Sequence, residues 1–326
     1  MEGKTGTMCV TGGAGYLGSW LVMKLLKRGY SVRATVRLDP EHKKDLSHLK
    51  NLPGASEHLK FFNADLNKPD SFDAAIEGCD GVFHVAHPLD FQGNEADPAR
   101  ISMAVEGTLG ILKACVNSKT VKRVVYTSSV AAVVLNTTGL MEMDENSWTD
   151  LELVETIKAP GSSYIVPKTL AEQAAIKFAQ EHGLDLITVA PSLIVGPFIC
   201  PHFPTSVFLA LAVLMGKTDK FQYISITSMV HIEDIVAAHI FLLECPNAKG
   251  RFICSALDTT IHDLAKFLSS KYEDFEMPID SLKEIEERKP LHLSSKKLLD
   301  LGFTYKYGLD EIYDGAIQCC KEKGLM

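Results

Sequence analysis

A tyrosine and a lysine four residues apart form a pair that could move a proton. Tyr164 and Lys168 lie in a segment with a helical pattern, where this spacing places two side chains on one face. A free tyrosine, with a pKa of about 10, is a poor acid or base at neutral pH. A neighbouring ammonium group favours the phenolate and lowers that pKa. Ser129, at the end of a predicted strand, could donate a hydrogen bond to the same carbonyl oxygen that Tyr164 protonates.

Three glycines in the pattern G-x-x-G-x-x-G occupy positions 12, 15 and 18, between a predicted strand and a predicted helix. Such glycines let the backbone approach a pyrophosphate, and the helix N-terminus offers free N–H groups and the positive end of its dipole. The alternative is a turn that only packs the helix against the sheet. Because a second strand follows where a dinucleotide fold requires one, nucleotide binding is favoured.

The end of that second strand indicates which dinucleotide binds. An acidic residue there would hydrogen-bond the ribose 2′-hydroxyl of NAD, whereas this chain has Arg37, followed by Lys43 and Lys44. A guanidinium group suits a 2′-phosphate, so NADP(H) is favoured over NAD(H), although Asp39 lies close by. Asp65 follows a later strand and could lie at the adenine edge, but the sequence alone does not decide that role.

The segments that must position these residues alternate between strand-like and helix-like patterns over the first 190 residues. Strands are predicted over 8–10, 31–37, 59–62, 81–85, 121–127 and 184–190, and helices over 17–28, 69–77, 96–116 and 162–182. This rhythm predicts an α/β fold, a doubly wound parallel sheet of the Rossmann type with helices on both faces.

The pattern changes after Pro191, where prolines punctuate a loop-rich stretch and the helices become short. We therefore expect a dinucleotide-binding domain over residues 1–190 and a smaller, mainly helical substrate-binding module over 191–225 and 251–326. Residues 226–250 contain a short strand and an apolar helix, and we expect them to return to the first domain.

Composition argues against several classes of protein. A net charge of −8, from 33 basic and 41 acidic residues, disfavours binding to nucleic acid or to an anionic membrane, since either needs a positive field. No apolar run is long enough to span a membrane, and the start of the chain is not typical of a secretory signal. The eight cysteines lack a metal-type spacing and suit a reducing compartment. We expect a cytoplasmic monomer or weak homodimer with no metal.

Short motifs along nearly the whole chain follow one family pattern. They lie at residues 10–13, 18–20, 36–37, 83–86, 126–129, 168–172, 195–198 and 230–232. In these stretches the chain resembles the extended short-chain dehydrogenase/reductases, specifically the plant dihydroflavonol-reductase-like group. The resemblance implies an oxidoreductase that transfers hydride between a nicotinamide and a substrate held in a cleft between the domains.

The resemblance also implies roles for individual residues. Ser129, Tyr164 and Lys168 would form the catalytic triad. The cofactor-binding residues would be Gly12, Gly15, Tyr16, Leu17 and Gly18 in the turn, Arg37 and Lys44 at the 2′-phosphate, Asp65 and Leu66 at the adenine, Val85 and Ala86 near the ribose, Lys168, and Pro191 and Leu193 beside the nicotinamide.

Two departures from the family pattern concern the substrate. His87 stands where the family usually has a hydroxyl residue, beside the nicotinamide end of the cofactor, and we interpret it as lining the active site. Val134 lies five residues after Ser129, where flavonoid reductases carry an Asn or Asp that holds substrate hydroxyls. This position belongs to an apolar run, so we expect a preference for methoxy, methylenedioxy or unsubstituted rings over a catechol.

A third departure is Pro167, which replaces the usual serine before the catalytic lysine. Proline is best tolerated in the first turn of a helix, and Ser162 or Ser163 could be the N-cap. We expect an irregular helix start that leaves the Tyr164–Lys168 pair intact.

The motifs together predict an NADPH-dependent reductase of a ketone or other carbonyl group on a bulky aromatic plant metabolite of the flavonoid, isoflavonoid or alkaloid type. An NAD(P)+-dependent dehydrogenase that oxidises an alcohol or hemiacetal of an alkaloid-type substrate is the alternative enzyme, because Tyr164 can act as acid or base. The alternative of another class is a non-catalytic NADP(H)-binding protein, which the intact Tyr164 and Lys168 disfavour.

Overall fold

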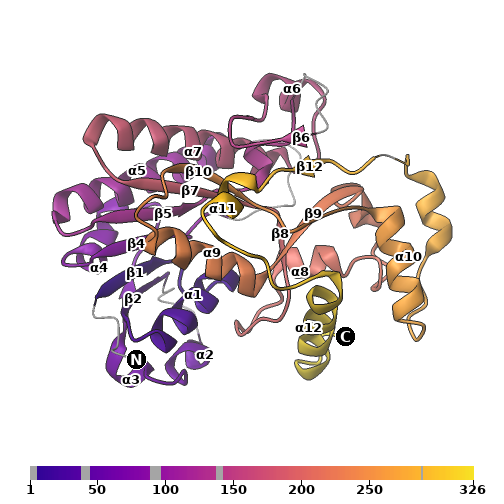
Figure 1. Cartoon of the computed structure of the whole chain (residues 1–326), viewed down its shortest axis with the longest axis horizontal. Coiled ribbons are helices and arrows are strands. Elements are labelled where there is room, and N and C mark those ends of the chain that lie inside the picture. Colours follow the sequence, from indigo (N-terminus) through magenta and orange to yellow (C-terminus); the bar gives the residue numbers. More distant parts are fainter. Residues whose placement is uncertain (1–5, 38–44, 89–96, 137–141, 288) are drawn as a thin grey trace.

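The computed structural model describes residues 6–37, 45–88, 97–136, 142–287 and 289–326. Lys44, predicted to hold a phosphate, lies outside the described residues, as do Asp39 and Lys43. Seven parallel strands form one large sheet in the order β10-β7-β5-β4-β1-β2-β3 (Figure 1). These are β1 (Thr7–Thr11), β2 (Ser31–Val36), β3 (Leu59–Asn63), β4 (Gly81–His84), β5 (Arg123–Thr127), β7 (Leu186–Pro191) and β10 (Gly250–Cys254).

Helices cover both faces of this sheet, which confirms the predicted Rossmann-type fold. On one face α5 (Pro98–Ser118) and α7 (Ser162–His182) pack together, beside the short helices η1 (Pro69–Phe72) and α4 (Asp73–Ile76). On the other face α1 (Tyr16–Lys27) packs against α9 (Ile232–Glu244). The central strands β4 and β7 are buried along their whole length because helices cover both faces of the sheet.

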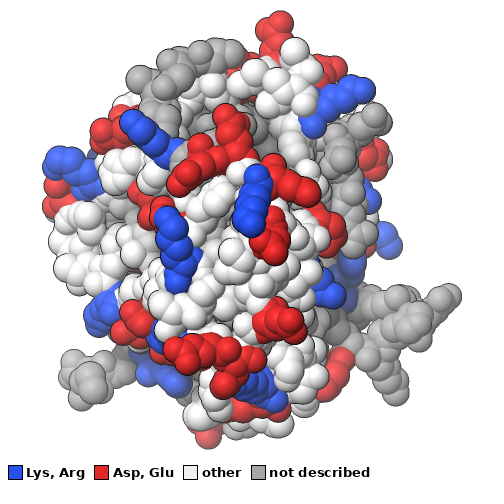
Figure 2. All heavy atoms as spheres, turned by 90° about the vertical axis from the view of Figure 1, so that its right-hand side faces the viewer, with Lys and Arg blue, Asp and Glu red and all other residues white. Residues whose placement is uncertain are grey.

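The C-terminal half adds a second, smaller sheet with its own apolar core. Its strands, in the order β11-β9-β8, are β8 (Leu193–Val195), β9 (Ile226–His231) and β11 (Leu257–Thr260). The helices α8 (Thr205–Ala210), α10 (Ile261–Lys271) and α12 (Leu309–Glu322) surround a core that includes Phe198, Phe221 and Tyr313. On the face that carries α10, acidic and basic side chains are interspersed (Figure 2).

Short elements lie between the longer helices and strands of both parts. They are α2 (Ser47–Lys50), α3 (Ala55–His58), η2 (Val130–Ala132), β6 (Glu142–Met143), α6 (Leu151–Thr156), η3 (Thr218–Tyr223), η4 (Ile279–Glu284), β12 (His292–Leu293) and α11 (Lys296–Asp300). Strand β6 pairs with β12, so the segment after β5 contacts the C-terminal part of the chain. None of the helices in the described ranges is long and apolar enough to cross a membrane.

The predicted domain boundaries need one correction. Strand β9 was expected to return to the large sheet, but it pairs with β8 and β11 in the small one. Residues 251–254 were assigned to the substrate module, yet they belong to β10, which pairs with β7 at the edge of the large sheet. The reason is burial: Phe252, Ile253 and Cys254 are almost fully buried, as a continuous apolar strand in a covered parallel sheet must be. Helix α9 does pack on the large sheet.

Candidate active site

The large sheet brings most of the predicted site residues to one edge. Because its strands are parallel, their carboxyl ends lie side by side. Gly12 follows β1, Arg37 follows β2, Asp65 lies just beyond β3, Val85 to His87 follow β4, Ser129 lies just beyond β5 and Pro191 ends β7. The chain turns outward in opposite directions from β1 and β4, which are neighbours, so the glycine turn lies at the topological switch point.

The glycine turn has the geometry that a phosphate group needs. Gly12 has a φ of +68°, and a side chain there would place its Cβ only 3.0 Å from Cα of Ala86. A Cβ on Gly18 would overlap the carbonyl oxygen of Gly12. Helix α1 begins with Gly15 as an N-cap that offers no side-chain hydrogen bond, so the first-turn N–H groups lack an intrahelical partner. These features fit a dinucleotide pyrophosphate.

A buried threonine holds the other strand end of the switch point in place. Oγ1 of Thr11 accepts hydrogen bonds from the backbone N–H groups of Val85 (3.0 Å) and Ala86 (3.1 Å). Its own proton is therefore directed to Nδ1 of His84, 3.0 Å away, and Nε2 of that histidine donates to Oγ1 of Thr108. Burial lowers the pKa of His84 to about 3, so the ring is neutral. This network was not predicted.

The residues expected at the adenosine half lie near one another. Arg37 is exposed directly after β2, and the backbone N–H of Ala64 donates to Val36 O, which draws the end of β3 beside it. The carboxylate of Asp65 accepts a hydrogen bond from its own turn, at Asn67 N (3.0 Å). Leu66 packs on α5, where a Cβ on Gly107 would lie 2.9 Å from its side chain. Contact of these residues with a cofactor stays a prediction.

Tyr16 and Leu17, predicted to contact the cofactor, occupy the first two positions of α1. The hydroxyl of Tyr16 donates to Gly196 O at 3.1 Å, and its ring lies edge-on to Phe198. Leu17 is buried in the core beneath the turn. Tyr16 therefore joins the glycine turn to the loop that begins the C-terminal half.

Ser129, Tyr164 and Lys168 come together at the carboxyl end of β5. A hydrogen bond joins the side chains of Ser129 and Tyr164. Nζ of Lys168 donates to Thr127 O at 2.8 Å and lies 6.0 Å from the centre of the Tyr164 ring. Helix α7 supplies two of the three residues from one face, as their spacing predicted.

The start of α7 differs from the prediction in one respect. The N-cap is Gly161, with a φ of +80°, rather than Ser162 or Ser163. A left-handed backbone conformation at this position favours glycine over serine. Its carbonyl accepts from the N–H groups of both Tyr164 (2.8 Å) and Ile165 (3.0 Å), which tightens the first turn. Pro167 lies inside the helix, and the helix continues past it with the Tyr164–Lys168 pair intact.

Burial governs the electrostatics of the triad. Desolvation lowers the pKa of Lys168 to about 7, although the nearby carboxylate of Glu172 acts to raise it. Desolvation raises the pKa of Tyr164, while the hydrogen bond with Ser129 acts to lower it. At neutral pH the tyrosine is therefore a phenol, and the lysine is close to its titration midpoint.

His87 lies against Tyr164, the position expected for a residue that lines the predicted site. Its ring meets the Tyr164 ring edge-on, with 5.7 Å between centroids. Burial lowers the pKa of His87 well below its usual value, so the ring is neutral. Its Nε2 atom is buried and has no hydrogen-bond partner among the described residues. A buried polar atom in this position fits a partner supplied by a ligand.

The remaining predicted residues lie where the large sheet meets the C-terminal half. Val134 is half-buried and packs, with Leu291, against an apolar cluster that includes Val133 and Ala190. Pro191 is buried at the end of β7, and Leu193, the first residue of β8, packs on the C-terminal core. In the part of the chain that the structure describes, no three His, Cys, Asp or Glu side chains group so as to hold a metal ion.

Comparison with known families agrees with this geometry. Residues 8–253 match the model of the NAD dependent epimerase/dehydratase family. The chain belongs to this family. The assignment confirms the resemblance to the extended short-chain dehydrogenase/reductases that the motifs indicated.

Plant proteins are similar to the chain along its whole length. Noscapine synthase of Papaver somniferum is 51% identical over all of the chain and 95% of that protein. Vestitone reductase of Medicago sativa is 49% identical over all of the chain and 99% of that protein. Dihydroflavonol 4-reductase of Callistephus chinensis is 46% identical over 98% of the chain and 88% of that protein.

Solved structures show the same fold. The crystal structure of alfalfa vestitone reductase superposes with a TM-score of 0.87, at 47% identity, over 98% of this chain and 100% of that one. Yeast methylglyoxal/isovaleraldehyde reductase Gre2, in complex with NADPH, has a TM-score of 0.79 at 25% identity, over 98% and 100% of the two chains.

Proposed function

We propose that this protein is an NADPH-dependent reductase of a ketone or other carbonyl group on a bulky aromatic plant metabolite of the flavonoid, isoflavonoid or alkaloid type. The observation that carries the proposal is the cluster of Ser129, Tyr164 and Lys168 at the sheet edge that also holds the glycine turn. The names of the plant relatives, two of which are reductases, support the class of substrate.

NADPH is the cofactor that this site would hold. The glycine turn and the first-turn N–H groups of α1 would bind the pyrophosphate, and Arg37 the 2′-phosphate. Pro191 and Leu193 would flank the nicotinamide, with His87 and Lys168 nearby. The complex of Gre2 with NADPH supports this choice. When bound, NADPH supplies the hydride that reduces the carbonyl group.

The protein's own residues would manage the proton. The phenol of Tyr164 is the acid that a reduced carbonyl oxygen requires, and the Ser129 hydroxyl donates a second hydrogen bond to that oxygen. The ammonium of Lys168 stabilises the phenolate that remains. Burial favours the phenol of Tyr164 before reaction, so the resting site is prepared for reduction.

Oxidation of an alcohol or hemiacetal by the same site, with NAD(P)+ as the hydride acceptor, is the second candidate. One relative, 51% identical to this chain, is named a synthase rather than a reductase. In the oxidative direction the Tyr164 phenolate would accept a proton from an alcohol or hemiacetal, and Lys168 would stabilise the phenolate before reaction.

A substrate and cofactor panel tests the proposal. Isoflavanones, dihydroflavonols and aromatic aldehydes would be offered with NADPH or NADH, and alkaloid hemiacetals with NADP+ or NAD+. We expect turnover of an aromatic carbonyl compound with NADPH, and none in a Tyr164→Phe control. Tight NADPH binding with no turnover of any compound would instead support the non-catalytic alternative.

A further inference from the structure

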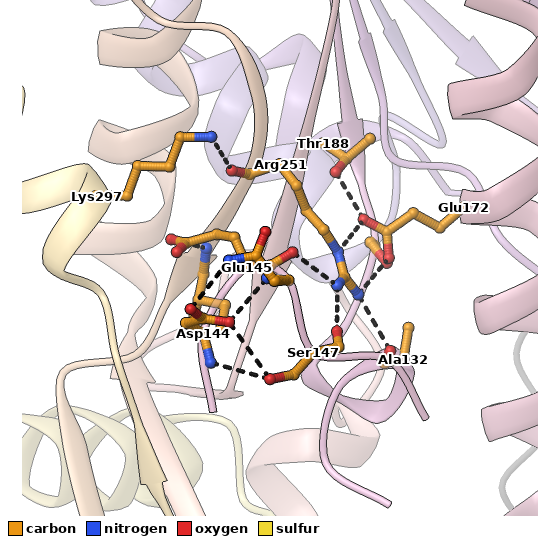
Figure 3. Close-up of polar contacts among 11 residues, drawn as sticks. Ala132, Asp144, Glu145, Ser147, Glu172, Thr188, Arg251 and Lys297 are labelled. Atoms are coloured by element: carbon orange, nitrogen blue, oxygen red, sulfur yellow. Dashed lines mark hydrogen bonds and ion pairs between the residues drawn. The ribbon is translucent and has the colours of Figure 1, made fainter. Parts of the chain in front are cut away.

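Arg251, on edge strand β10, uses every hydrogen-bond donor of its guanidinium group (Figure 3). Nε donates to Oε1 of Glu172 (3.0 Å), and Nη2 donates to Oε2 of Glu172 (3.1 Å) and to Ala132 O (3.1 Å). Nη1 donates to Glu145 O (3.2 Å) and to Ser147 O. An arginine has five such N–H groups, so none is left over.

This guanidinium group is almost completely shielded from water. The side chains of Arg251 and Glu172 are 6% and 0% exposed, and the Trp148 ring lies 3.7 Å from the guanidinium carbon. A buried ion pair offsets its desolvation only when further hydrogen bonds satisfy both partners. Glu172 meets that condition as well, because it also accepts from Ser128 Oγ and Thr188 Oγ1, both at 2.6 Å.

The Nη2 group of Arg251 is connected to Ser129 of the triad through Ala132. Ala132, whose carbonyl Arg251 binds, ends the 3-10 turn η2. Within that turn the N–H of Ala131 donates to Oγ of Ser129 at 3.1 Å. Ser129 is in turn hydrogen-bonded to Tyr164. The position of the serine hydroxyl therefore depends on how η2 is held.

Arg251 also binds Glu172, which lies on α7, the helix that carries Tyr164 and Lys168. Glu172 follows Lys168 by four residues and Tyr164 by eight, so all three lie along one side of α7. Its carboxylate is bound by Arg251 and by the hydroxyl of Ser128, the residue before Ser129. Arg251 thus contacts both of the segments that must meet in the active site.

We propose that Arg251 is a positioning residue, which holds the turn after Ser129 against helix α7 and so keeps the serine in register with Tyr164 and Lys168. It touches neither the reacting groups nor the glycine turn, and it acts through Glu172 and Ala132. The proposal rests on the proposed reductase function and identifies a residue that determines the rate of turnover.

The chain offers a matched control in Arg123, at the amino end of β5. Its guanidinium also binds one carboxylate, that of Asp185, and several backbone carbonyls, and its side chain is 11% exposed. The carbonyl partners are those of Leu242, Leu243, Cys245 and Ala248. The types of donor and acceptor are the same, although Asp185 is 44% exposed, and this cluster lies at the amino ends of the strands, away from the triad.

The first experiment compares Arg251→Lys with Arg123→Lys, since each keeps the positive charge and loses the planar fork. For Arg251→Lys we expect kcat to fall about tenfold, the order expected from a displacement of well under 1 Å. The dissociation constant of NADPH should stay within about twofold. Arg123→Lys should also lower the melting temperature but leave kcat within about twofold. Unchanged kcat in Arg251→Lys, with an active wild type, would overturn the positioning role and leave the reductase function standing.

Hydrogen–deuterium exchange tests the same contact without turnover. In Arg251→Lys we expect the amides of residues 130–135 to exchange at least about tenfold faster, while those of residues 11–18 keep their rates. Unchanged exchange over 130–135 would overturn the inference even if the wild type reduced none of the substrates tested.

If Arg251→Lys does not fold, Trp148→Leu provides a second variant. This change removes the ring that covers the guanidinium and leaves the Arg251–Glu172 ion pair intact. It should change kcat and exchange in the same direction but by less. No change in either would also overturn the inference.

Discussion

The two halves of the active site are built in different ways. The predicted cofactor half is centred on one local motif, the glycine turn, which directly follows β1 and packs against the neighbouring strand end at Ala86. The groups that would bind the pyrophosphate there are backbone N–H groups. The predicted substrate half is assembled from segments that are far apart in the chain, because β6 pairs with β12, and Val134 and Leu291 pack against one apolar cluster.

This difference separates what the family shares from what the individual protein can vary. Backbone N–H groups and glycines bind a pyrophosphate regardless of the substrate. We expect side chains such as His87 and Val134 to contact the part of the ligand that changes from one substrate to another. Cofactor binding and substrate choice should therefore respond to different mutations.

The largest expected effect lies where the two halves meet. Tyr164→Phe removes the acid that protonates the substrate, so we expect kcat to fall by at least ~10²-fold. The dissociation constant of NADPH, measured by fluorescence titration, should barely change. A variant that keeps most of its turnover would show that another group transfers the proton.

The cofactor half should respond to Arg37→Ala. A charge-assisted contact with a phosphate contributes about 1.5–3 kcal/mol, so NADPH binding should weaken by roughly tenfold to a hundredfold. Binding of NADH, which lacks the 2′-phosphate, should stay nearly the same. Titration of both cofactors against both proteins gives the answer, and equal losses would mean that Arg37 does not bind the phosphate.

The substrate half should determine the relative kcat/KM for substrates with hydroxylated and methoxylated rings. Val134 offers no partner to a catechol hydroxyl, and burying one without a partner costs about 1–3 kcal/mol. We expect kcat/KM for an O-methylated or unsubstituted aromatic ketone to exceed that for dihydroquercetin by about tenfold. Val134→Asn should narrow this ratio without changing NADPH binding. A wild-type preference of tenfold or more for dihydroquercetin would contradict the interpretation of Val134 as an apolar part of the substrate site.

The smallest expected effect is a change with pH. Because burial lowers the pKa of Lys168 to about 7, raising the pH through that value removes the ammonium that stabilises the Tyr164 phenolate. The value of kcat/KM for reduction should therefore decline above pH 7, while NADPH binding at the glycine turn does not follow the same curve. The profile of Lys168→Met should lack this decline, and a wild-type profile that is flat to pH 9 would argue against the role of the lysine.

The sequence by itself determined the features that depend on neighbours in the chain. Strand and helix periodicity predicted the parallel sheet, and residues 162–182 form the helix that was expected. The spacing of Tyr164 and Lys168 placed them on one face because helix geometry is local. The ends of parallel strands share one edge, so Ser129, His87 and the glycine turn could also be expected near one another.

Tertiary structure alone decided the contacts between distant segments. No local pattern marks Arg251 as the partner of Glu172 or Thr11 as the partner of His84, since such pairs form only when the assembled sheet and the helices on it bring distant segments together. The same reason explains the correction to β9 and β10: both are short, and only the available neighbours determine which sheet each one joins. The N-cap of α7 followed the loop geometry that Gly161 permits rather than the serines beside it.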